Sequence, residues 1–435
     1  MSAVEWSPWA LVAVPILGAL AGLPLCSTPR EAKRFLLLTP ATTGALVAVL
    51  SMLPGPGLPH LALLAIVPIA AFISLLSQPL HISHRAPWAI SVAMLGLVLG
   101  VLIAPGRMLW VFVAVLLASL VAILSWARTV GTSSPTWGIA TYGVGAVMAA
   151  SAAVAPPVPA ALAGLLAACT LLPLFPFHAG HVAMVMRLPG NLPAFLVTAL
   201  PLVGLLALQA TSADLPMVVA EWLGPAAIVS MIYGSVRALG QRHPLSVLAH
   251  ASIAFASILW WFLAVTGILT PSSTVYVLAL GLVTGGLAIG WYALRARHGE
   301  LDIRALSGLV HPMPRFAVLF SLLALAALGM PPFGVFSGFM GMVLSPDFRL
   351  PASFFIVILV WLSASWYYLE VMRRLLFGPT RPEHRYEDMR ETEVAALSML
   401  LVLLVLLGTL PSRWFDGGGA TRTPRPLVET TQWHP

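Results

Sequence analysis

The chain has 435 residues, of which 59% are hydrophobic and 9% are charged, and its formal net charge is +7. So few charged side chains cannot cover the surface of a water-soluble protein, which excludes a soluble globular protein and indicates an integral membrane protein. The polar connections are too short for a separate globular domain, so we expect a single membrane domain over residues 1–435.

Apolar runs fill the chain, and each is long enough for a spanning helix of roughly 20 residues. Their hydrophobicity is continuous and lacks the alternation of a membrane β-barrel, so the sequence predicts an all-α polytopic protein with about fourteen transmembrane helices. The first run has no basic leader and no clear cleavage site, which favours a retained helix over a signal peptide. The runs cover residues 7–27, 35–54, 59–80, 86–105, 108–127, 137–155, 159–185, 192–211, 217–238, 245–268, 272–295, 314–344, 353–377 and 393–412.

The basic residues are divided unevenly between the two sides that this order of helices implies. With the N-terminus outside, five of the 22 lysines and arginines fall on the outer side, which leaves 17 for the inner side. This asymmetry is typical of cytoplasmic loops, so we expect a multi-pass protein of a prokaryotic inner membrane with both termini on the outer, periplasmic side. The same sorting accounts for the net positive charge, and no nucleic-acid partner is expected. The five outer residues are Arg107, Arg349, Arg413, Arg422 and Arg425.

The seventh run contains the segment "LLPLFPFHAGHV", residues 171–182, with two prolines and two histidines. Pro173 and Pro176 each remove a backbone donor and clash with the preceding turn, which predicts a break in the helix near residues 171–178. His178 and His181 are three residues apart, so their rings can share one helix face.

The twelfth run repeats this pattern in "LGMPPFGVFSGF", residues 328–339, where Pro331, Pro332 and Gly334 interrupt the apolar sequence. Interrupted helices at corresponding places in two halves of a chain indicate inverted repeats around a buried polar pathway. We therefore expect two inverted five-helix repeats, at about 86–211 and about 217–377, followed by a C-terminal tail at 413–435.

Several segments in order resemble one known family. "LPLFPFHAGHV", "HPLSVLAHASIAFASI" and "LGMPPFGVFSGFM" are similar to segments of the antiporter-like subunits of respiratory complex I and of their relatives in Mrp antiporters, membrane-bound hydrogenases and inorganic-carbon uptake complexes. The resemblance extends over about residues 108–379. It implies fourteen helices with discontinuous helices 7 and 12, and a central chain of lysine, glutamate and histidine residues that carries protons or sodium ions.

The sequence departs from the family at most positions of that chain. Charged groups inside a bilayer cost about 2.5 to 3.5 kcal/mol each and are retained for function, so their loss matters. A conventional charge relay therefore cannot be carried over. The matching positions hold Val113, Leu171, Leu202, Phe255, Leu280 and Phe339.

The remaining candidates for a proton pathway are His178, His181, His250 and Glu370. The first two either cap carbonyls that the prolines free or handle protons. Glu370 precedes two arginines by three and four residues, which favours an ion pair within its own helix over a place on an ion pathway. His250 is expected to extend toward the cytoplasmic interface.

The sequence contains no phosphate-binding loop, no catalytic triad spacing and no cofactor motif, so no catalytic, cofactor-binding or metal residue is assigned and a self-contained enzyme is not predicted. The expected partners are the lipid bilayer and other subunits. The leading hypothesis is an antiporter-like membrane subunit of an inorganic-carbon uptake, respiratory or hydrogenase-type complex, which translocates or couples protons or cations by a reduced pathway. The alternatives are a non-conducting scaffold that anchors a catalytic partner, and a stand-alone transporter of a weakly polar solute.

Overall fold

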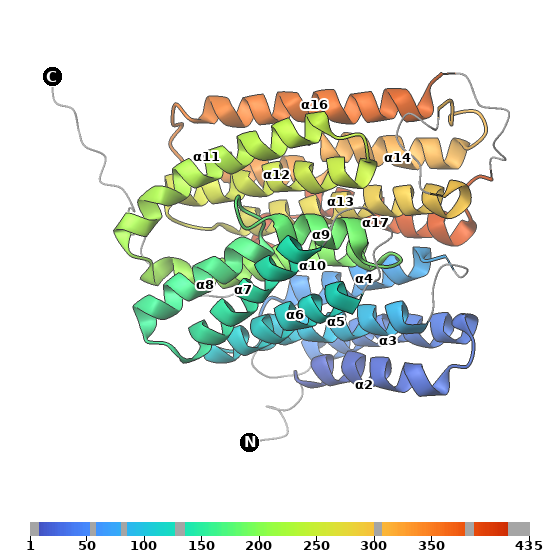
Figure 1. Ribbon diagram of the computed structural model, residues 1–435, viewed down its shortest axis with the longest axis horizontal. Coiled ribbons are helices and arrows are strands. Elements are labelled where there is room, and N and C mark those ends of the chain that lie inside the picture. Colours follow the sequence, from blue (N-terminus) through green and yellow to red (C-terminus); the bar gives the residue numbers. More distant parts are fainter. Residues whose placement is uncertain are drawn as a thin grey trace.

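The computed structural model is an all-helical bundle whose helices lie side by side with their long axes broadly aligned (Figure 1). Sixteen α-helices occur in the part of the chain that the structure describes, and no strand is assigned there. Most of the expected tail, from residue 416 onward, lies outside the described residues. The described residues are 8–52, 58–79, 85–126, 135–299, 307–378 and 387–415.

The helices follow the predicted apolar runs in order. The first half of the chain contains α2 (Ala10–Leu25), α3 (Pro29–Met52), α4 (Leu61–Ser77), α5 (Arg85–Ile103), α6 (Arg107–Trp126), α7 (Thr136–Val154), α8 (Pro157–Leu171), α9 (Ala179–Arg187) and α10 (Leu192–Thr211). The second half contains α11 (Met217–Gly240), α12 (Pro244–Thr266), α13 (Pro271–His298), α14 (Pro314–Ala327), α15 (Gly334–Val343), α16 (Phe354–Leu376) and α17 (Glu391–Thr409). Ten of the described helices are long and apolar enough to cross a bilayer.

Three helices form the centre of the bundle. In their most apolar windows 94% of the residues of α10, 94% of those of α12 and 100% of those of α13 are buried, whereas only 28% are buried in α7 and α16. A helix that is hydrophobic on all sides has to be surrounded by other apolar groups. The buried helices therefore obtain these groups from protein, and the outer helices are left to obtain theirs from lipid.

Both proline-rich segments interrupt their helices. Helix α8 ends at Leu171 and α9 begins at Ala179, while α14 ends at Ala327 and α15 begins at Gly334. Each interruption contains one cis peptide bond, at Phe175–Pro176 and at Pro331–Pro332.

Neighbouring side chains satisfy the backbone groups that these interruptions free. The indole N–H of Trp260 on α12 donates to the carbonyl of Leu172, at 3.2 Å, directly after α8. In the second interruption the indole N–H of Trp361 on α16 donates to the carbonyl of Leu328, at 2.6 Å, directly after α14. Backbone groups away from water have to be paired within the protein, so these two tryptophans allow the chain to break inside an apolar environment.

A polar contact fixes the turn between α9 and α10. Asn191 donates from Nδ2 to the hydroxyl of Ser77 at 2.8 Å, and its carbonyl accepts from the hydroxyl of Ser74 at 2.7 Å. At the same end of α4, the ammonium of Lys33 donates to the carbonyls of Leu76 at 2.8 Å and Gln78 at 3.3 Å. The first helices are thereby tied to the helix that follows the first interruption.

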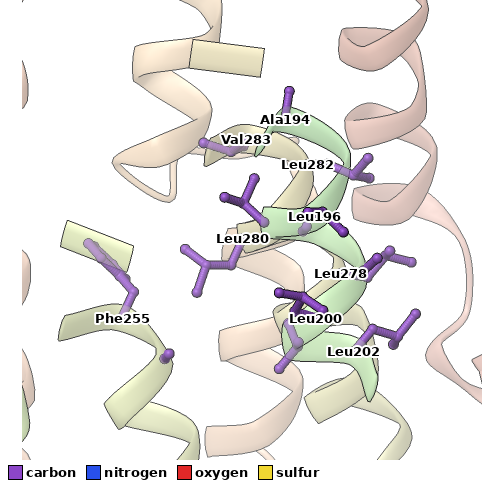
Figure 2. Packing of buried hydrophobic residues seen from close by; sticks show 14 of the residues in the cluster. Ala194, Leu196, Leu200, Leu202, Phe255, Leu278, Leu280, Leu282 and Val283 are labelled. Atoms are coloured by element: carbon purple, nitrogen blue, oxygen red, sulfur yellow. The ribbon is translucent and has the colours of Figure 1, made fainter. Parts of the chain in front are cut away.

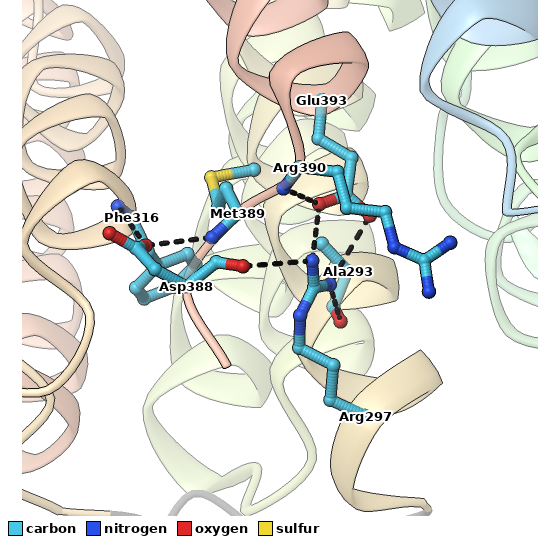
Figure 3. Close-up of polar contacts among 7 residues, drawn as sticks. All are labelled: Ala293, Arg297, Phe316, Asp388, Met389, Arg390 and Glu393. Carbon is cyan, nitrogen blue, oxygen red and sulfur yellow. Dashed lines mark hydrogen bonds and ion pairs between the residues drawn. The ribbon is translucent and has the colours of Figure 1, made fainter. Parts of the chain in front are cut away.

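A buried ion pair joins the ends of α13 and α17, and the sequence reasoning did not anticipate it (Figure 3). Nη2 of Arg297 lies 2.6 Å from Oε2 of Glu393, with side chains only 9% and 3% exposed. The guanidinium also donates to the carbonyl of Asp388 at 3.2 Å, and the Asp388 carboxylate accepts the backbone N–H groups of Phe316 at 3.2 Å and Met389 at 2.7 Å. These contacts connect α13, α14 and the start of α17.

Candidate functional site

The first interruption places both predicted histidines at the start of α9. His178 is the residue directly before α9 and is half-buried, while His181 lies in the first turn and is 1% exposed. Pro173 and Pro176 precede them in the interruption, where the backbone N–H of Phe175 donates to the hydroxyl of Ser230 at 3.0 Å. The side chains of α11 and α12 therefore complete this region.

His178 is bonded to a tyrosine that the sequence reasoning missed. Its Nε2 lies 2.9 Å from the hydroxyl of Tyr233 on α11, and the two ring centroids are 4.7 Å apart. The ring of Phe175 contacts both, with its centroid 5.6 Å from the imidazole and 4.7 Å from the ring of Tyr233. A tyrosine hydroxyl both donates and accepts, so it can pass a proton to or from a neutral imidazole.

His250 on α12 also lies near the ring of Tyr233. Its ring centroid lies 6.3 Å from that of Tyr233, and its Nδ1 donates to the carbonyl of Ser246 at 2.8 Å. The hydroxyl of Ser246 donates in turn to Oε1 of Gln241 at 2.9 Å, close to the end of α11. His250 is 4% exposed and does not extend to the interface as expected.

A close approach of two helices brings these rings together. Gly234 follows Tyr233 on α11, and a Cβ at this position would lie 2.7 Å from the backbone nitrogen of Ala254 and 2.8 Å from the carbonyl oxygen of His250. Any side chain other than hydrogen would push α11 away from α12. Gly234 therefore sets the spacing between Tyr233 and His250.

His181 occupies a separate, smaller polar position. Its Nε2 is 2.7 Å from the hydroxyl of Ser252 on α12, which donates to the carbonyl of Ala249 at 2.8 Å, so His181 is the donor in this pair. A cavity of about 10 Å³ adjoins the ring and is also lined by Thr284 and Leu280. This volume is about that of one water-sized sphere.

The Nδ1 atoms of His178 and His181 have no hydrogen-bond partner among the described residues. Each ring can therefore accept a proton on one nitrogen while its other nitrogen contacts a hydroxyl, which is what a relay requires. Within the described part of the chain, no three His, Cys, Asp or Glu side chains gather as a metal site would need.

Glu370 belongs to a different part of the molecule. Its carboxylate accepts from Nε of Arg373 at 2.8 Å and also pairs with Arg374, both on its own helix α16. This is the intrahelical arrangement that the sequence favours. The structure thus brings together His178 and His250 through Tyr233, sets His181 beside them, and leaves Glu370 in its own ion pairs.

The positions that match the family's charged chain are packed with hydrocarbon. Figure 2 shows Leu202, Phe255 and Leu280 with other members of the buried hydrophobic cluster, and these residues are 0%, 1% and 7% exposed. Phe339 lies against the ring of Trp361, with centroids 4.5 Å apart, and Trp361 in turn lies 5.1 Å from Phe255. Leu171 and Val113 are buried as well. An aromatic and aliphatic core therefore occupies the region between the two interruptions.

Comparison with known proteins gives similarity in both sequence and fold. Residues 158–364 match the model of the family described as NADH:quinone oxidoreductase/Mrp antiporter, transmembrane. NADH-quinone oxidoreductase subunit M of Mycobacterium tuberculosis strain H37Rv is 30% identical over 194 residues, which cover 44% of this chain and 35% of the relative. The chain thus matches about a third of that relative's length.

Two solved structures share the fold over nearly the whole chain. A chain of respiratory complex I from Thermus thermophilus has a TM-score of 0.79 at 20% identity. The match covers 94% of this chain and 97% of the complex I chain. A chain of the Mrp complex from Dietzia sp. has a TM-score of 0.74 at 15% identity, with coverage of 94% and 95%.

Proposed function

We propose that the chain is an antiporter-like membrane subunit, which the family match over residues 158–364 and the shared fold support, and that it serves a multisubunit membrane complex by moving protons along a reduced polar route. The route consists of His178, Tyr233 and His250, with His181 at its inner side. The observation that carries this proposal is the contact of 2.9 Å between His178 and Tyr233 at the interruption between α8 and α9.

The route extends from one end of the bundle toward its middle. Gln241, Ser246 and His250 are linked by the bonds described above, and the ring of Tyr233 lies 4.7 Å from the imidazole of His178 and 6.3 Å from that of His250. A neutral histidine can take up a proton on one ring nitrogen and release one from the other, and a tyrosine hydroxyl can pass it on. Such a route does not need a permanently charged side chain in the membrane. In this proposal the histidines and the tyrosine take the place of the lysine and glutamate side chains that are missing at the positions matching the family's charged chain.

The proposal includes the architecture around the route. Two inverted repeats, at about 86–211 and about 217–377, would each contain one interrupted helix, α8 with α9 and α14 with α15. Fourteen membrane crossings follow if each interrupted pair, α8 with α9 and α14 with α15, spans the bilayer once. The charge distribution supports a location in the inner membrane with both termini outside.

A non-conducting scaffold is the second candidate, and the apolar core supports it. Leu202, Leu280 and Phe255 put hydrocarbon where the family places charged side chains. The hydroxyl of Tyr276 in this region is bonded to the carbonyl of Phe255 at 2.9 Å, so it caps a backbone group there. In that case the fold anchors a catalytic partner, and the histidines serve as hydrogen-bonding groups at the break.

Reconstitution of the complex in vesicles separates the two candidates. A pH-sensitive dye inside the vesicles reports proton flux while the partner subunits drive the reaction. The reduced route requires flux in the parent protein and its loss in the double variant with His178→Ala and His181→Ala. Flux that is unchanged in the double variant contradicts the route, and an absence of flux in the parent favours the scaffold.

The identity of the complex is open to a direct test. Both an inorganic-carbon uptake complex, with a zinc-bearing soluble partner, and a respiratory or hydrogenase-type complex accommodate such a subunit. Affinity purification in mild detergent followed by metal analysis distinguishes them, because zinc without iron supports the first and iron–sulfur clusters support the second.

A further inference from the structure

A cavity of about 300 Å³ lies where the end of α11 meets the start of α12 and the last turns of α16. Helices α11 and α16 lie next to one another there (Figure 1). The polar residues of the lining are Gln241, Arg242, Tyr367, Glu370 and Arg374. The site is separate from the histidines described above.

The charge of this cavity is positive. Arg242 is exposed and makes no hydrogen bond or ion pair with the described residues. Arg374 pairs with Glu370, so the lining carries two arginines and one carboxylate. Guanidinium groups offer several N–H donors in a fixed plane and bind phosphate oxygens strongly, so the cavity is suited to a phosphate group.

The rim of the cavity faces the surroundings of the bundle. Leu239 is 46% exposed and Trp366 is 71% exposed, and both line the cavity. Large apolar side chains remain exposed along the same two helices, including Val236 on α11 and Leu362 on α16. In a membrane-spanning bundle these surfaces lie against acyl chains. Trp366, in the middle of α16, is part of this apolar side of the cavity.

We propose that this cavity binds the phosphate head group of an anionic phospholipid, such as phosphatidylglycerol or cardiolipin. Arg242 and Arg374 contact the phosphate, and the acyl chains lie along the exposed faces of α11 and α16. Basic pockets between helix ends at the positively charged side of a membrane protein have the chemistry that such lipids recognise. This site uses none of the histidines, and it meets the proton route only at Gln241, which lines the cavity and accepts from the hydroxyl of Ser246.

Delipidated protein in neutral detergent provides the test. Short-chain phosphatidylglycerol, short-chain phosphatidylcholine and inorganic phosphate are each titrated in, and binding is followed by native mass spectrometry and by the midpoint of thermal unfolding. We expect saturable binding and a higher midpoint with phosphatidylglycerol alone. Arg242→Gln and Arg374→Gln should each weaken it by roughly fivefold.

Arg373→Gln is the matched control. Arg373 carries the same charge as Arg374 and pairs with the same carboxylate, Glu370, but it does not line the cavity. It should leave most of the affinity intact. Equal binding of phosphatidylcholine overturns the proposal, as does an equal loss in the control. Tight binding of inorganic phosphate that displaces the lipid identifies a free-anion site and also overturns it. If a variant fails to fold, the comparison of the lipids on the parent protein decides.

Discussion

The hydroxyl of Tyr233 on α11 lies 2.9 Å from Nε2 of His178, so one helix reaches directly into the break between two others. Tyr233→Phe removes this hydroxyl and retains the ring that lies near both His178 and His250. We expect proton flux in vesicles to fall close to that of empty vesicles, while the loss of one hydrogen bond lowers the free energy of unfolding by only about 1 kcal/mol. If the variant complex is reconstituted in the same amount as the parent and the flux is unchanged, Tyr233 is not part of the route.

The spacing of α11 and α12 depends on Gly234. Gly234→Ala places a Cβ within 3 Å of the α12 backbone, so the helices have to separate. Such overpacking costs about 1 to 3 kcal/mol and should also reduce flux, because Tyr233 then moves away from His250. Gly143→Ala on α7 is the control, since a Cβ there meets nothing within 4 Å. Equal unfolding midpoints for the two variants would show that the close approach is not needed.

Trp260 and Trp361 are expected to stabilise the two interruptions through their indole N–H groups. Trp260→Phe or Trp361→Phe leaves the carbonyl of Leu172 or Leu328 without its donor. An unsatisfied buried acceptor costs about 1 to 3 kcal/mol, which unfolding in denaturing detergent can measure. Trp222→Phe, on the exposed side of α11, serves as the control because its side chain is 69% exposed. A similar loss in the control would attribute the effect to ring size alone.

Arg297 and Glu393 should be strongly dependent on one another. Removing one charge, as in Arg297→Met, leaves a buried carboxylate without its partner and is expected to cost about 3 to 5 kcal/mol. The double variant Arg297→Met with Glu393→Leu should recover most of this loss, because no buried charge remains. Arg373→Gln, which breaks an exposed pair, should have little effect. Additive losses in the double variant would mean that the two residues act independently.

Much of this architecture could be predicted from local sequence. Apolar runs show where helices lie, and Pro173 and Pro176 predict a break because proline cannot complete the helical bond pattern. The ion pairs of Glu370 could also be predicted, because its two arginines follow three and four residues later and side chains at that spacing are neighbours on a helix.

The partners across the bundle could not be predicted in this way. Tyr233, Ser230 and Trp260 contact the interruption only because α11 and α12 pack against it, and that packing depends on the whole chain. The spacing of Ser230 and Tyr233, three residues apart in an apolar helix, was the one available signal of a polar face. Arg297 and Glu393 are separated by 96 residues, and no local pattern connects them.

The chain contains one lysine, and the structure holds its ammonium against the carbonyls at the end of α4. Amine-directed reagents therefore have a single side-chain target, apart from the N-terminal amine. The ammonium has to leave these carbonyls before it can react, so the rate of acylation at Lys33 measures how often that end of α4 opens. Because Gln78 also accepts the backbone N–H of Asn191, the same label reports whether the turn after α9 moves when the complex works.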